Sequence, residues 1–177
     1  MDSIDYLKKE ISVTINLYNA KRYEDVIRKS KILIKKYPEQ ILLYNILSLS
    51  LSAQNKNDEA ISHLNKALNL DPNNIFVLNN LGLIYSNLYI LDKSEFYLNE
   101  SLKKNSNFFD ALINFGNLLT KKGESENSIK FYKKALENAK TNVQNEVSLM
   151  ALGSAYQQIG NFEESVKTYK KLLQINP

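Results

Sequence analysis

The chain has 177 residues, 44% of them apolar, with five Gly and three Pro, so it can bury a core and favours helices over strands. The absence of Cys and the single His exclude disulfides, thiolate metal sites and nucleophile-activating Cys or His pairs. The net charge of +4 lies on scattered lysine doublets. No apolar run reaches the ~18 residues of a membrane span, and the N-terminus does not have the pattern of a signal peptide. We therefore expect a cytoplasmic, non-enzymatic chain without a cofactor or metal and without membrane contact.

Several landmarks recur at an interval of 34 residues. They are prolines, glycines and small residues: Pro38 and Pro72, Gly82 and Gly116, and the series Ala60, Ser94 and Ser128. A fixed interval shared by independent landmarks predicts a repeating structural unit.

The first unit covers residues 7–40 and departs most from the pattern. Thr14 stands where Gly is expected, and Val26 stands where Ala is expected. We expect its second helix over residues 23–36, ended by Pro38, because proline disfavours helical geometry in the residue before it.

The second and third units cover residues 41–74 and 75–108. We expect Ala60 to lie where the two helices of one hairpin approach closely, so that a small residue is needed there. Pro72 closes the second unit, whereas the third unit has Ser106 at the same place.

The fourth and fifth units cover residues 109–142 and 146–177. Gly123 is expected to end the first helix of the fourth unit. The interval between the repeated glycines then widens to 37 residues, so three extra residues have entered. We place them at Thr141–Gln144, where a capping-box pattern would start the next helix about one turn early.

Large apolar residues, Gly and Tyr recur at the same spacing in the third and fifth units. In the third unit these are Leu78, Leu81, Gly82 and Tyr85, and in the fifth Leu149, Leu152, Gly153 and Tyr156. The pattern resembles the tetratricopeptide repeat, a pair of antiparallel helices. The resemblance implies an all-α fold, a right-handed α-solenoid of five helix-turn-helix hairpins in one domain (residues 1–177). It also implies a non-catalytic protein–protein interaction scaffold that binds a peptide or partner protein.

Partner binding is expected on the face of each unit's first helix that does not carry the packing landmarks. In the first two units this face is mainly apolar, and in the next two it is rich in amides. The predicted peptide-binding residues are Ile15, Tyr18, Asn45, Ile46, Leu49, Asn79, Asn80, Leu83, Asn114, Asn117 and Lys121.

Asn80 and Asn114 occupy the same position of successive units, so their side chains are predicted to form a short ladder along the groove. An amide presents both a donor and an acceptor to the backbone of an extended peptide. The pair resembles the asparagine ladder in the repeat region of protein O-linked N-acetylglucosamine transferases. Ile46 and Ala151 interrupt it on either side, and ordinary solvated asparagines are the alternative interpretation.

Two other functions stay open at this stage. The repeats could be the N-terminal substrate-recruiting arm of a larger enzyme, of glycosyltransferase or sulfotransferase type, with its catalytic domain outside this chain. Nucleic-acid binding is disfavoured, because the densest basic cluster lacks interleaved aromatic side chains. That cluster is Arg28, Lys29, Lys31, Lys35 and Lys36. The lone His63 is interpreted as an ordinary packed or surface residue.

The last predicted helix keeps an apolar face and has no capping helix beyond it up to Pro177. The residues concerned are Val166, Tyr169, Leu172 and Leu173. This pattern predicts either a further segment of a longer protein or self-association through the C-terminal hairpin.

Overall fold

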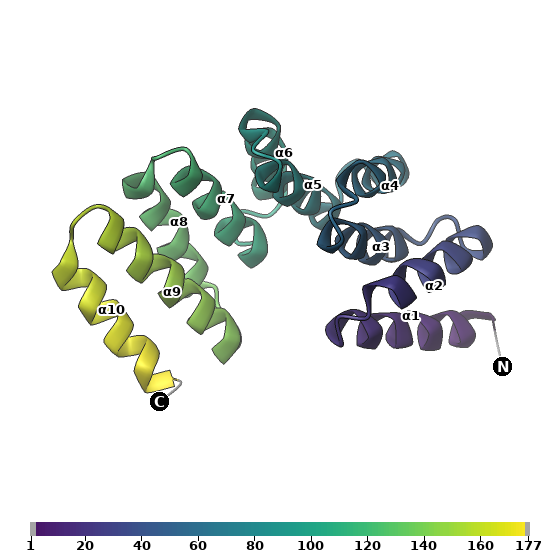
Figure 1. Cartoon of the computed structure of the whole chain (residues 1–177), viewed down its shortest axis with the longest axis horizontal. Helices are drawn as coiled ribbons and strands as arrows, with labels where there is room; N and C mark the ends of the chain where they lie inside the picture. Colours follow the sequence, from purple (N-terminus) through teal and green to yellow (C-terminus); the bar gives the residue numbers. More distant parts are fainter. Residues whose placement is uncertain (1–2, 176–177) are drawn as a thin grey trace. The chain divides into compact units, whose positions relative to one another are not determined.

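The computed structural model describes residues 3–175, and over that range all regular structure is helical. The helices, drawn in Figure 1, are α1 Ser3–Asn19, α2 Tyr23–Lys36, α3 Ile41–Ala53, α4 Asn57–Leu70, α5 Ile75–Asn87, α6 Leu91–Lys104, α7 Phe109–Lys121, α8 Ser125–Glu137, α9 Asn142–Gln158 and α10 Phe162–Ile175. They group into two compact units, Met1–Ile84 and Tyr85–Pro177, with the division inside α5.

In the first compact unit the helices pack in chain order, α1 on α2, α2 on α3 and α3 on α4, and α1 also contacts α3. Within each hairpin the second helix runs back along the first (Figure 1). Val26, Leu43, Leu47 and Leu64 are fully buried between these helices. Val26 occupies the position of Ala60, Ser94 and Ser128 in later units, so a repeat landmark is part of this core.

In the second compact unit α6 packs on α7, α7 on α8, α8 on α9 and α9 on α10, and α7 also contacts α9. One core cluster joins Leu112, Tyr132, Ala135, Leu152 and Tyr156. These residues come from three successive helices, so each hairpin buries the apolar face that its neighbour leaves open.

The turn inside each hairpin repeats one hydrogen-bond pattern. After α7, the amide of Gly123 donates to the Thr120 carbonyl (3.0 Å) and the amide of Glu124 donates to the Leu119 carbonyl (2.8 Å). This is a Schellman motif, which needs one residue at positive φ. That residue is Lys21, Asn55, Tyr89, Gly123 and Gly160 in the five turns. The prediction that Gly123 ends its helix is confirmed.

The connections between hairpins do not depend on proline. Asp71, before Pro72, has φ −142° and ψ 95°, and Asn105, before Ser106, has φ −142° and ψ 96°. In both connections the side chain of the first residue accepts a hydrogen bond of 3.0 Å from the amide two residues on. The short polar side chain therefore fixes the bend whether or not proline follows.

Helix α9 has 17 residues, where α3, α5 and α7 have 13 each. Thr141 Oγ1 accepts a hydrogen bond from the amide of Gln144 (3.2 Å). The Gln144 side chain accepts in turn from the amide of Lys140 (2.8 Å), one residue before the cap. The predicted early start of this helix is confirmed.

In the fourth and fifth hairpins a tyrosine ring of the second helix lies directly against a repeated glycine of the first. A Cβ atom at Gly116 would lie 2.4 Å from Cε1 of Tyr132, and one at Gly153 would lie 2.8 Å from Cε1 of Tyr169. Real Cβ contacts are longer, so glycine lets each tyrosine ring lie against the backbone of the first helix.

Candidate peptide-binding surface

The predicted apolar end of the surface is only partly accessible. Ile15 is exposed on α1, Tyr18 and Leu49 are half-buried, and Ile46 is buried. Burial, and to a lesser extent the neighbouring Tyr23 ring at 5.7 Å, raises the pKa of Tyr18. Ile46 therefore belongs to the core, while Ile15 and part of Tyr18 face solvent.

Three asparagine side chains form a hydrogen-bonded chain in the first compact unit. Asn79 Nδ2 donates to Asn80 Oδ1 (3.3 Å), and Asn80 Nδ2 donates to Asn45 Oδ1 (3.2 Å). The three residues are 4%, 8% and 7% exposed, in that order. Ile46 has the same position in its repeat as Asn80, so the sequence predicts that these two residues are neighbours along the ladder. The hydrogen bond is instead made by Asn45, the residue before Ile46 on α3. The amides thus satisfy one another within an otherwise apolar layer.

Exposed apolar side chains lie on the same helix stripes as this asparagine chain. Leu42 precedes Asn45 by three residues on α3, and Phe76 precedes Asn80 by four on α5, spacings that put each pair on one helix face. Both Leu42 and Phe76 are exposed, and Leu83, one turn further along α5, is half-buried. Counting positions within each unit finds Leu42 and Phe76, although neither belongs to the predicted set.

In the second compact unit the predicted residues have partners within the chain. Asn117 is exposed, and its Oδ1 accepts a hydrogen bond from the Tyr132 hydroxyl (2.8 Å). Lys121 donates to the carbonyl oxygen (2.9 Å) and the hydroxyl (3.1 Å) of Ser86. Asn114 is half-buried and has polar contacts of its own. These side chains therefore form hydrogen bonds or other contacts within the chain as well as lying at the predicted binding surface.

Helix α9 carries an exposed apolar stripe that the predicted set omits. Val143, Val147 and Met150 are all exposed, and their spacing of four and three residues puts them on one face of the helix. Val147 and Met150 occupy the second and fifth positions of their unit, which are groove positions in the other units. Extending the same count to the fifth unit identifies them.

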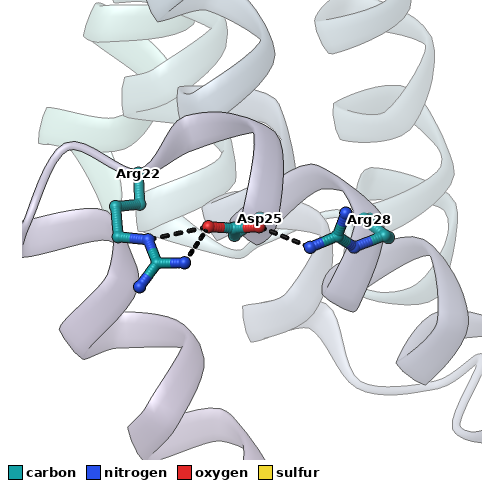
Figure 2. Close-up of polar contacts among 3 residues, drawn as sticks. All are labelled: Arg22, Asp25 and Arg28. Carbon is teal, nitrogen blue, oxygen red and sulfur yellow. Dashed lines mark hydrogen bonds and ion pairs between the residues drawn. The ribbon is translucent and has the colours of Figure 1, made fainter.

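The basic cluster on α2 is largely paired with carboxylates. Figure 2 shows Asp25 between two arginines, with Arg22 Nε 2.7 Å from its Oδ2 and Arg28 Nη2 2.5 Å from its Oδ1. The following lysines also form ion pairs, Lys29 with Glu10 and Lys31 with Glu59. These carboxylates compensate part of the positive charge of α2, and a phosphate backbone would have to compete with them.

His63 lies on α4 with its ring 6.2 Å from that of Tyr44. Burial lowers the pKa of His63, and the neighbouring Lys66 and Lys31 lower it further. Across residues 3–175, no group of three or more His, Cys, Asp or Glu side chains is placed to hold a metal ion. None of the helices in that range is long and apolar enough to cross a bilayer.

The hairpins, their shared turn and their interlocked cores define a helical-repeat protein. Family models identify the repeats: a TPR repeat model matches residues 50–88 and a tetratricopeptide repeat model matches residues 108–177. The chain therefore contains tetratricopeptide repeats, and the predicted all-α solenoid class is confirmed. Such repeats are typical of protein–protein interaction scaffolds, most of which are non-catalytic. A search of curated proteins finds no significant match.

Solved structures show the same fold. The thermophilic TPR protein TTC0263 of Thermus thermophilus is 18% identical with a TM-score of 0.85, over 97% of this chain and 92% of that one. A MamA structure is 22% identical with a TM-score of 0.70, over 97% of both chains. A chain of the APC/C hetero-tetramer Cut9–Hcn1 is 16% identical with a TM-score of 0.86, over 96% of this chain and 34% of that one.

Proposed function

We propose that this chain is a non-catalytic scaffold that binds an extended segment of a partner protein along the first helices of its repeats. The hydrogen-bonded chain of Asn79, Asn80 and Asn45, on the same helix stripes as the exposed Leu42 and Phe76, carries the proposal. Hydrogen bonds between buried amides stabilise a fold little more than well-packed hydrophobic side chains would at the same positions. Stability alone therefore does not explain these amides, and their position beside exposed apolar side chains favours a binding role.

The two kinds of side chain have separate tasks in this proposal. Apolar side chains of the partner pack on Leu42 and Phe76, which supplies most of the affinity. Amide groups bond the partner's peptide units without regard to its sequence, because an amide presents both a donor and an acceptor. Asn114 would have the same task in the second compact unit.

Site-specific photocrosslinking tests where the partner lies. A photoreactive phenylalanine analogue replaces Phe76, and a matched control replaces Phe96, which is equally aromatic and exposed but lies on the second helix of a hairpin. Irradiation in an extract of the source cells is expected to link a partner polypeptide to position 76 only. Equal labelling at both positions would contradict binding along the first helices.

The asparagine ladder is tested with the partner so captured. The variant Asn80→Ala with Asn114→Ala is expected to bind it about tenfold more weakly, as lost hydrogen bonds to a peptide backbone imply. The exposed Asn65→Ala on α4 serves as control. Unchanged affinity in the double variant would remove the amides from the proposal and leave only the apolar contacts.

The alternative, a substrate-recruiting arm of a larger glycosyltransferase or sulfotransferase, would use the same surface. It differs in that the bound segment is then a substrate of the attached enzyme. The source reading frame around this segment distinguishes the two, since only the alternative requires a catalytic domain in the same polypeptide.

A further inference from the structure

The outer face of α10 is an apolar surface without a neighbouring helix in the described chain. Phe162, Val166 and Leu173 are 66%, 52% and 63% exposed. Their spacing of four and seven residues puts all three on one side of the helix. Three large apolar side chains on one face form a patch that soluble proteins rarely leave open without a reason.

The same positions are covered in the earlier hairpins. The counterparts of Val166 are Ile27, Ile61, Glu95 and Ile129, and those of Leu173 are Ile34, Leu68, Leu102 and Leu136; all eight are buried or half-buried. In the pairs α2 with α3 and α8 with α9, the covering element is the first helix of the next hairpin. The α10 face thus has the residues of a helix-binding surface.

The face is also hollowed and positively charged. Phe162 and Val166 line a depression of about 740 Å³ together with Lys167, Lys170, Lys171, Gln174 and a single acidic residue, Glu163. Glu164 forms an ion pair with Lys167 (3.2 Å) and leaves the other two lysines as the dominant charges. A helix seated here would meet lysines along its edges, so acidic flanks on that helix would complement the surface.

The first helix of the chain does not have the complementary apolar face. Lys9 and Asn16 of α1 are exposed where α3 buries Leu43 and Ser50, and Val13 is the one apolar residue among these outward positions. Tyr6 is exposed on the same side of α1, so a second copy would place only Tyr6 and Val13 on α10, next to the polar Lys9 and Asn16. Two α10 faces packed on each other would bring Lys170 and Lys171 of both copies together, and like charges at close range oppose that contact.

We propose that the outer face of α10 docks an amphipathic helix of another protein, with aliphatic side chains against Phe162, Val166 and Leu173 and with Asp or Glu along its edges. This surface shares no residue with the Leu42 and Phe76 region, so the chain would hold two partner segments at once. The sequence predicts either self-association or a further segment of a longer protein at this α10 face, and both are competing outcomes.

Two designed peptides test the proposal with the full chain. Both are amphipathic helices with the same leucine and alanine face, and one has glutamate where the other has lysine at its edges. By fluorescence anisotropy the acidic peptide is expected to bind at least about tenfold more tightly, and added salt should narrow the difference. Equal binding of the two peptides, or no binding of either, would overturn the proposal.

Two variants locate the binding on the chain. Val166→Glu is expected to weaken the acidic peptide's binding at least about tenfold, because a charge enters the centre of the apolar face. Ile32→Glu is the matched control, since Ile32 is 63% exposed on α2. Both positions are exposed, so both variants should keep the wild-type thermal unfolding. A dimer in sedimentation that Val166→Glu abolishes would show that a second copy is the occupant and would overturn the proposal.

Discussion

The second hairpin, α3 with α4, and the fourth hairpin, α7 with α8, place different side chains at the same two positions. The second hairpin has Ser48 and Leu64, both fully buried. The fourth has Gly116 with the Tyr132 ring directly against it. The smaller residue on the first helix goes with the larger one on the second. Packing density is thus conserved over the pair rather than at each position.

The terminal hairpins extend this comparison. The first hairpin has Thr14 and Ser30, two small polar residues that are fully buried, and the fifth has Gly153 and Tyr169. Thr14 donates to the Glu10 carbonyl of its own helix (2.7 Å), whereas the Ser30 hydroxyl has no hydrogen-bond partner. The first hairpin therefore lacks the interlocked pair that the later hairpins have.

The largest effect should come from closing the space beneath the Tyr132 ring. Gly116→Ala is expected to lower the free energy of unfolding by about 2 kcal/mol, because overpacking costs more than the gain in helix propensity. The ring cannot easily move, since its hydroxyl donates to Asn117. Urea unfolding monitored by circular dichroism measures the change.

The paired substitution separates packing from other causes. Gly116→Ala combined with Tyr132→Leu makes the fourth hairpin resemble the second, so its destabilisation should be clearly smaller than the sum of the two single variants. Strict additivity would show that the glycine and the tyrosine are not coupled. Gly153→Ala should cost less than Gly116→Ala, because Tyr169 is only half-buried.

A smaller effect, of opposite sign, is expected at the hairpin turns. Tyr89 has φ 57°, a conformation in which a bulky side chain is strained, while Gly123 has φ 81° at the same place in the next hairpin. Tyr89→Gly should raise the free energy of unfolding by about 1 kcal/mol, because the strain is removed. Loss of the cation–π contact with Lys121, whose Nζ lies 5.2 Å from the ring centroid, will reduce this gain. Thermal unfolding of the variant and the wild type measures this change in stability.

Two exchanges at the same turn position calibrate that result. Asn55→Gly should stabilise less than Tyr89→Gly, because asparagine tolerates positive φ better than tyrosine does. Gly123→Ala should destabilise. If Tyr89→Gly lowered the stability, the tyrosine ring would have to stabilise the turn by more than its backbone conformation costs.

The smallest effect is a pH dependence confined to the second hairpin. His63 stands where the fourth hairpin has Phe131. Its pKa is lowered in the folded chain, mainly by burial, so below the ordinary value of 6.5 the unfolded chain takes up the proton more readily. Stability should therefore fall as the pH is lowered through that value and recover as it rises. His63→Phe should remove this part of the slope between pH 7 and pH 5; an unchanged slope would contradict it.

The repeat interval was sufficient to predict the helices, because the landmark residues that set it are the ones that pack. Residues 23–36 form a helix as expected, and α9 starts one turn early at Thr141. The turns were less accessible to prediction, since neither Lys21 nor Tyr89 favours positive φ. Closure of the hairpin imposes that conformation on whichever residue occupies the position.

The candidate surface was predicted less well, for a geometric reason. Equivalent positions of successive units were expected to lie side by side, yet Asn80 bonds to Asn45 rather than lying beside Ile46. Neighbouring helices cross at an angle and are offset along their axes, so contacts join positions that differ by one residue. On α10, Val166 and Leu173 are exposed as predicted, whereas Tyr169 and Leu172 are half-buried.

The lengthening of α9 has a consequence for how such a chain can change its length. The added residues precede Leu149, the first packing landmark of the unit, so the interior contacts downstream keep their order. An insertion of the same size inside a hairpin turn would break the paired bonds that hold its positive-φ residue. Residues or whole hairpins can therefore be added or removed at the connections between hairpins, while each remaining hairpin keeps its internal geometry.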